Sequence, residues 1–87
     1  MEIEIADWAP DLFKQTKLLG KVKVLLNGKM FIWMNVVAGK TRPFAKFPTF
    51  KAREDEYLSY IGWPENPKME REISDAIIKK LQETNEI

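Results

Sequence analysis

The segment KVKVLLNGKMFIWMNVV, residues 21–37, decides the fold of this chain. It consists of two apolar-rich runs, residues 21–26 and 30–37, that are joined through Asn27-Gly28. An Asn-Gly pair between two strand-like runs is the strongest short-range signal for a β-hairpin. The segment therefore predicts two antiparallel strands, and the remaining elements are placed around them.

The loop of this hairpin has two possible lengths, which distribute the side chains differently. A strict two-residue turn would pair Leu26 with Lys29 and mix lysines with aliphatic residues on one face. A three-residue loop pairs Leu26 with Met30 and separates the two kinds of side chain. One face then holds Val22, Val24, Leu26, Met30, Ile32, Met34 and Val36. Because a slip of one residue exchanges whole faces, burial of an aliphatic face favours the three-residue loop.

The opposite face of the predicted sheet combines bases with aromatic rings. It holds Lys21, Lys23, Leu25, Phe31, Trp33 and Asn35, and a further strand over residues 43–47 adds Phe44 and Lys46. Ammonium groups neutralise phosphates, and aromatic rings stack unpaired bases with a gain of ~1–3 kcal/mol per base. This combination is typical of a surface for single-stranded nucleic acid. Two alternatives stay open, namely a second core under the segment 57–63 and an interface with another protein.

The charges of the chain are segregated along the sequence, although the net charge is only +1. Residues 14–53 hold ten bases and no acid, whereas residues 1–13 hold four acids and no base. Residues 54–87 hold nine acids and four bases. A surface of one sign attracts polyanions. The alternative is that the acidic C-terminal segment neutralises the basic strands within one fold.

The two ends of the chain predict one more strand and a helix. Ile3 and Ile5 alternate with acids and predict a short strand that Ala9-Pro10-Asp11 ends. Asn66-Pro67 is a helix start, with Asn as N-cap and Pro at the first helical position. A helix over residues 66–83 places its apolar residues on one face: Met69, Ile73, Ala76, Ile77 and Leu81.

The segment between the last predicted strand and the helix is charged at first and then aromatic. Residues 50–56 predict a loop, and residues 57–63 predict an extended or irregular segment that lies over the core. With 87 residues, the chain has room for one small domain. The predicted fold is therefore α+β, a four-stranded antiparallel sheet with one C-terminal helix packed on one face.

Composition argues against most catalytic sites. The chain has no cysteine and no histidine, which removes thiolate ligands, disulfides and the commonest general base. Gly39-Lys40-Thr41 is similar to the end of a P-loop, but Met34 stands where the first glycine would be and no helix follows. We therefore predict no enzymatic activity, no cofactor and no metal site.

Nothing in the sequence indicates a membrane. No apolar run approaches the ~20 residues of a membrane span. The N-terminus, Met1-Glu2-Ile3-Glu4, is acidic and is unlike a signal peptide. The sequence predicts a cytoplasmic protein without a membrane partner.

From Gly20 onward, the chain resembles the SpoVG family (stage V sporulation protein G, or septation protein SpoVG). Val36-Val37-Ala38-Gly39 precedes a turn, and the following strand 44–49, FAKFPT, is similar to the family's FVAMPS. Trp63-Pro64-Glu65-Asn66 is similar to HPIN, and residues 73–77, ISDAI, are similar to IQDAV. The chain would then be a single SpoVG-like domain over residues 1–87, with a divergent N-terminal segment over 1–19 and the helix over 66–83.

The resemblance implies a homodimer that binds DNA or RNA and acts in regulation. In the family, basic residues after the strand-end proline are associated with nucleic-acid binding. Lys51 occupies one such place with Arg53 close by, whereas Phe50 stands where the family is basic. Together with the sheet face, the candidate nucleic-acid-binding residues are Lys21, Lys23, Phe31, Trp33, Phe44, Lys46, Lys51 and Arg53. The alternative function is a protein–protein interaction module that uses the same aromatic face.

Overall fold

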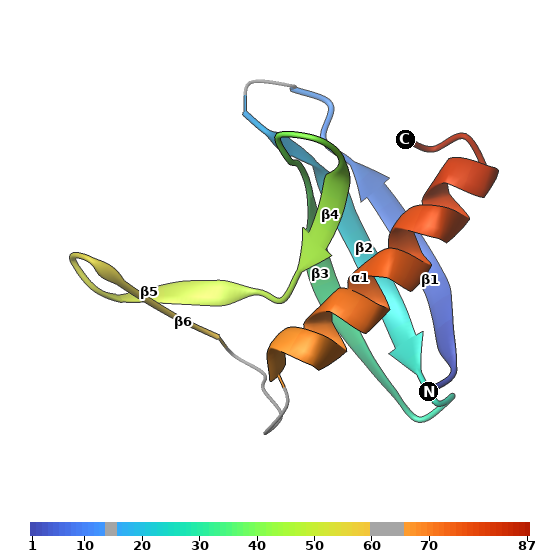
Figure 1. Ribbon diagram of the computed structural model, residues 1–87, viewed down its shortest axis with the longest axis horizontal. Helices are drawn as coiled ribbons and strands as arrows, with labels where there is room; N and C mark the ends of the chain where they lie inside the picture. The colour runs from blue at the N-terminus through green and yellow to red at the C-terminus, as the bar shows by residue number, and fades with distance from the viewer. Residues whose placement is uncertain (14–15, 60–65) are drawn as a thin grey trace.

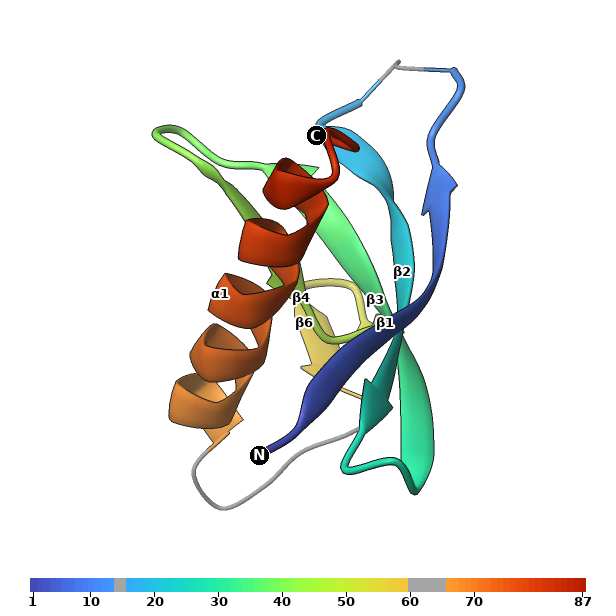
Figure 2. The same ribbon diagram turned by 90° about the vertical axis from the view of Figure 1, so that its right-hand side faces the viewer.

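A four-stranded antiparallel sheet carries a single helix on one of its faces (Figure 1). The computed structural model describes residues 1–13, 16–59 and 66–87. The strand order is β1-β2-β3-β4, with β1 at Ile3–Pro10, β2 at Leu18–Leu26, β3 at Met30–Ala38 and β4 at Pro43–Lys46. The helix α1 spans Asn66–Glu83, and Figure 2 shows helix and sheet as two layers. The predicted fold class and helix bounds are confirmed.

The β2–β3 hairpin adopts the three-residue loop. Leu26 pairs with Met30, Val24 with Ile32, and Val22 with Met34. Asn27 and Gly28 have positive φ values of 53° and 64°, which Asn and Gly tolerate best. The predicted register is therefore confirmed.

The core lies between the aliphatic face of the sheet and α1. Its sheet residues are Val22, Val24, Leu26, Ile32, Met34, Val36, Ala45 and Phe47, and its helix residues are Ile73, Ile77, Ile78 and Leu81. Met30 belongs to the predicted aliphatic face but is 47% exposed, because it begins β3 beside the hairpin turn. Removal of this apolar surface from water is the main favourable contribution to folding.

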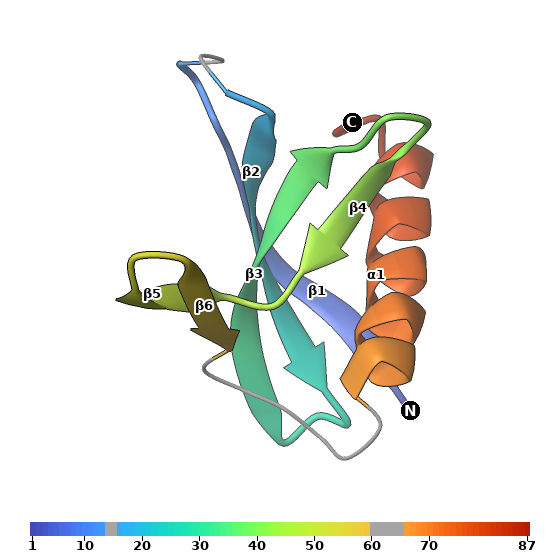
Figure 3. The same ribbon diagram turned by 60° about the vertical axis from the view of Figure 1, so that its left-hand side comes forward.

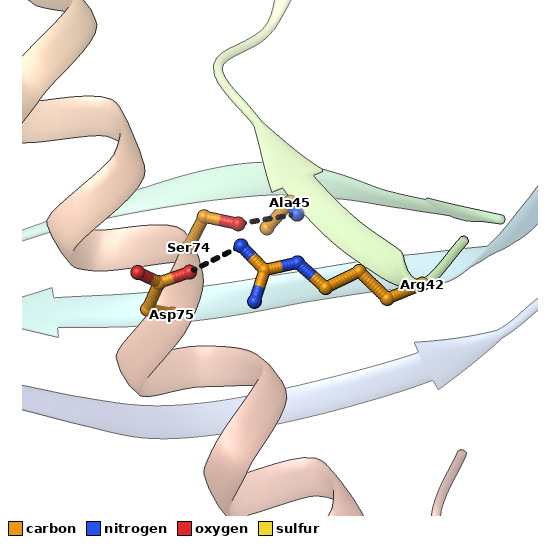
Figure 4. A network of polar contacts seen from close by, with 4 residues as sticks. All are labelled: Arg42, Ala45, Ser74 and Asp75. Carbon is orange, nitrogen blue, oxygen red and sulfur yellow. Dashed lines mark hydrogen bonds and ion pairs between the residues drawn. The ribbon is translucent and has the colours of Figure 1, made fainter. Parts of the chain in front are cut away.

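Side chains of α1 form hydrogen bonds with backbone groups along both edges of the sheet. The Ser74 Oγ accepts a hydrogen bond of 2.8 Å from the buried N–H of Ala45 in β4 (Figure 4). The Glu70 Oε2 accepts one of 3.0 Å from the N–H of Phe47. At the other edge, the Lys80 Nζ donates to the carbonyl oxygen of Ile3 in β1. These bonds occupy edge groups that would otherwise need water or another strand.

The N-terminal strand is longer than predicted. It continues through Ala9 to Pro10, which pairs with Gly20 of β2. Proline is tolerated here because β1 is an edge strand and its missing N–H breaks no central ladder. A register shift between Ile5 and Asp7 interrupts the alternation of the strand.

The prediction of a loop over residues 50–56 is wrong. Residues Thr49–Arg53 form β5 and Glu56–Ser59 form β6, a separate two-stranded antiparallel sheet. Phe50 pairs with Leu58 and Lys51 with Tyr57, so each pair contains one aromatic side chain of high strand preference. The charged residues that suggested a loop lie at its turn, around Glu54-Asp55.

The β5–β6 hairpin extends away from the four-stranded sheet (Figures 1 and 3). In Figure 3 the hairpin and α1 lie on opposite sides of β3 and β4. Tyr57 and Leu58 are 65% and 44% exposed, so this part of the predicted 57–63 segment does not lie over the core. Residues 60–63, and the helix entry at 63–65 that contributed to the SpoVG resemblance, lie outside the described residues, as does the Asn66 side chain predicted as N-cap.

We predict that Ser74→Ala lowers the free energy of unfolding by about 1–3 kcal/mol, because the buried N–H of Ala45 loses its acceptor. The higher helix propensity of Ala offsets roughly 0.5 kcal/mol of this loss. Urea denaturation with an unchanged m-value measures the difference.

Asp75→Asn is the matched control at the next helix position. Its exposed carboxylate makes an ion pair of 3.7 Å with Arg42, and such pairs contribute little. Equal stability losses in the two variants would contradict the structural role of Ser74.

Candidate nucleic-acid interface

The face of the sheet opposite α1 is called the outer face, and it is formed by alternate residues of β2, β3 and β4. Successive side chains of a strand point to opposite faces of a sheet. The residues that alternate with the core residues therefore have their side chains on the face away from α1. They are Lys21, Lys23, Leu25, Phe31, Trp33, Asn35, Val37, Phe44 and Lys46. The register thus brings six of the eight candidate residues onto one surface.

Residues that pair with each other across the strands form rows on the outer face, and its lysines and aromatic rings occupy neighbouring rows. Lys23 pairs with Trp33 in one row. In the next row, Asn35 pairs with Lys21 on one side and with Lys46 on the other. Every base of the face therefore lies near an aromatic ring or shares a row with an amide side chain.

The aromatic rings of this face are accessible. Phe31 is 57% exposed, Phe44 42% and Trp33 39%. A second core over the outer face would bury them, so the described part of the chain does not form one. The helix α1 lies on the other face, so its acids do not cover these lysines.

Lys23 has an internal partner on the outer face. Its Nζ lies 4.1 Å from the centroid of the Phe31 ring. A cation–π contact of this kind contributes ~0.5–1 kcal/mol at exposed sites. A base that stacks on this side of Phe31 must displace the ammonium group.

Acidic side chains of β1 border the outer face. Their position there is not predicted from the sequence. Asp7 pairs with Lys23 and Glu4 pairs with Leu25, so β1 adds two carboxylates to one edge. Without the register shift between Ile5 and Asp7, Asp7 would share the core-facing side of Ile3 and Ile5. A bulge of this kind carries no clear sequence signal. The outer face is therefore polarised, with acids at β1 and bases from β2 to β4.

Lys51 and Arg53 lie on the β5–β6 hairpin rather than on the outer face. Both are exposed, and Lys51 pairs with Tyr57. Arg53 pairs with Glu56, an acid that reduces the local positive charge. The hairpin continues the chain directly from β4, so its bases extend from the β4 side of the sheet.

The surface of the described residues has several shallow hollows. One of them, of about 710 Å³, is lined by apolar residues such as Trp8 and Leu19 together with two acidic and two basic side chains. Within residues 1–13, 16–59 and 66–87, no three acidic side chains are grouped closely enough to hold a metal ion. No helix in this part of the chain is both long and apolar enough to cross a bilayer.

Comparison with family models, curated proteins and solved structures finds no match to this chain. The resemblance to the SpoVG family therefore stays a prediction.

Proposed function

We propose that this protein binds single-stranded DNA or RNA through the outer face, with weak sequence selectivity and in a regulatory role. The observation that carries the proposal is the sharing of one exposed surface by three lysines and three aromatic rings. Lys21, Lys23 and Lys46 neutralise phosphates of the strand. Phe31, Trp33 and Phe44 stack its unpaired bases. Lys51 and Arg53 add phosphate contacts from the hairpin.

The shape of the surface favours a single strand over a duplex. A duplex is usually read by an element that enters its major groove, whereas the outer face offers rings that need unstacked bases. Phosphate contacts position a strand without reading its sequence. Asn35 is the one amide side chain among the outer-face residues, which supports weak selectivity.

The second candidate function is a protein–protein interaction module that uses the same aromatic rings. Exposed Phe31, Trp33 and Phe44 favour it, because aromatic side chains are enriched at interfaces. Salt separates the two functions. Binding through several phosphates weakens steeply as salt rises, whereas an apolar protein contact does not.

We predict salt-sensitive binding of a fluorescent single-stranded 30-mer, which anisotropy measures at low and moderate salt. The double variant Lys21→Glu/Lys23→Glu should lose at least about tenfold in affinity, because each lost phosphate contact removes its counterion release. Double-stranded 30-mer should bind more weakly than the single strand.

The matched control is Lys68→Glu/Lys79→Glu, which changes the net charge equally but on exposed positions of α1. This control should keep most of the affinity. Equal losses in both variants would point to net charge alone, and no binding at micromolar protein would overturn the proposal.

We predict that Asp7→Asn raises the affinity for the single strand. Asp7 stands opposite Lys23, where its carboxylate repels phosphates and attracts the ammonium group. The expected gain is about two- to fivefold at low salt and shrinks at high salt, since exposed charges are screened. A lower affinity of the variant would show that Asp7 does not oppose binding.

We propose further that the protein is a homodimer, as the SpoVG resemblance implies, and that the second copy covers one face of the β5–β6 hairpin. Phe50 and Leu58 pair on that face and are 38% and 44% exposed. A two-stranded hairpin alone is marginally stable in water, so cover on this face would stabilise it.

Sedimentation equilibrium should give about twice the chain mass of 10.2 kDa. Leu58→Asp should shift the protein to the monomer, because it puts a charge into an apolar contact. Tyr57→Asp, on the other face of the hairpin, should leave the dimer intact. A monomeric parent protein would contradict the proposed dimer.

A further inference from the structure

A basic hollow lies at the end of the outer face, where β3 turns into β4. Its volume is about 350 Å³, at the lower end of the ~300–1,000 Å³ typical of ligand sites. The residues that line it are Lys17, Val37, Ala38, Gly39, Lys40, Phe44 and Lys46. Phe44 and Lys46 belong to the outer face as well, so the hollow is continuous with that surface.

The backbone that carries the two additional lysines is fixed. The N–H of Ala38 donates a hydrogen bond of 2.8 Å to the carbonyl oxygen of Lys17, which ties the start of β2 to the end of β3. The N–H of Gly39 donates one of 3.1 Å to the carbonyl oxygen of Arg42, which closes the turn that carries Lys40. These bonds restrict the backbone before binding, which limits the entropy that ordering costs.

The Phe44 ring rests against this turn. A Cβ atom at Gly39 would lie 3.1 Å from the ring and 2.4 Å from the carbonyl oxygen of Arg42, so only glycine permits the close approach. The ring is still 42% exposed. It therefore forms a supported wall of the hollow on which a planar group can stack.

The charge of this hollow is of one sign. Three lysines line it, and no carboxylate does among the described residues. Two neighbouring hollows differ, because Glu70 and Asp75 line one and Asp11 and Glu86 line the other; Lys40 lies at the border of all three. Three ammonium groups around one hollow repel each other, and a polyanion relieves that repulsion.

We propose that this hollow is a nucleotide subsite, in which Phe44 stacks one unpaired base and Lys17, Lys40 and Lys46 hold the flanking phosphates of the same strand. The inference rests on the proposed function and extends the path of the strand beyond the sheet. Lys17 and Lys40 lie in connecting segments, outside the strands that the hairpin pattern identified. The strand leaves the outer face at the β3–β4 turn. Phe44 pairs with Val37 there, whereas the β1 acids Asp7 and Glu4 pair with Lys23 and Leu25, farther along the sheet.

The test compares Lys17→Gln/Lys40→Gln with Lys68→Gln/Lys79→Gln, which removes the same charge from α1. Anisotropy with the single-stranded 30-mer is measured from low to moderate salt. The first variant should bind about tenfold more weakly. Its salt dependence should also be shallower: the negative slope of log K against log salt should lose about 1.4 of its magnitude, at ~0.7 per phosphate contact on single strands. The α1 variant should change neither.

A second readout addresses the hollow directly. Titration of the isotope-labelled protein with adenosine monophosphate should shift the amide signals of Gly39 and Lys40, and Phe44→Leu should weaken that response severalfold. The same titration with inorganic phosphate tests whether the hollow binds a phosphate group that carries no nucleobase.

The outcomes distinguish failure of the subsite from failure of the function proposed for the outer face. Strand binding that survives Lys17→Gln/Lys40→Gln with unchanged slope overturns the subsite and leaves the outer-face function intact. Absence of strand binding by the parent protein overturns the proposed function. In that case the subsite is overturned too, even if phosphate or the mononucleotide shifts Gly39 and Lys40, because the hollow then binds small anions only.

Discussion

The hydrogen bond from the buried N–H of Ala45 to the Ser74 Oγ holds α1 against the β4 edge, on the aliphatic face of the sheet. Ala45 is in β4, the edge strand whose N–H has no further strand to bond. A helix side chain takes the place of that strand, so α1 is held over β4 rather than merely packed on an apolar surface. Glu70 repeats the arrangement one turn earlier with Phe47, and Lys80 reaches β1 from the other end of the helix. With both edges and one face engaged by α1, the outer face is the surface left for a ligand.

The parts of the structure that the sequence predicts are those in which burial decides between alternatives. The β2–β3 register is one case, because only one of two loops collects Val22, Ile32 and their neighbours on a single face. The helix is another, since its apolar spacing and its Asn-Pro start agree. The hairpin register places Lys21, Lys23, Phe31 and Trp33 on one surface, and the predicted strand over residues 43–47 adds Phe44 and Lys46.

The parts that the sequence does not predict depend on local irregularities and on contacts between loops. The bulge in β1 turns Asp7 to the outer face, and no residue type there requires a bulge. The charged turn of the β5–β6 hairpin makes its sequence similar to that of a loop, although Phe50 and Leu58 form a cross-strand pair. The hollow at Lys17 and Lys40 needs the start of β2 to meet the β3–β4 turn, and a distance between loops has no periodic signal in the sequence.

If a strand binds the outer face as proposed, the distribution of charge over that face decides which side chains are free to contact it. Lys23 already interacts with the Phe31 ring and stands opposite Asp7, so part of its charge is balanced within the protein. Lys21 and Lys46 share a row with the neutral Asn35. The unbalanced positive charge therefore increases from β1 toward β4, where Phe44 and the basic hollow lie. A base stacked on Phe31 would gain ~1–3 kcal/mol and displace a cation–π contact of ~0.5–1 kcal/mol, so the net gain there is reduced. No lysine of the described residues lies over the Phe44 ring. In the proposed complex, stacking on Phe44 therefore displaces no such contact and takes place beside the lysines of the basic hollow.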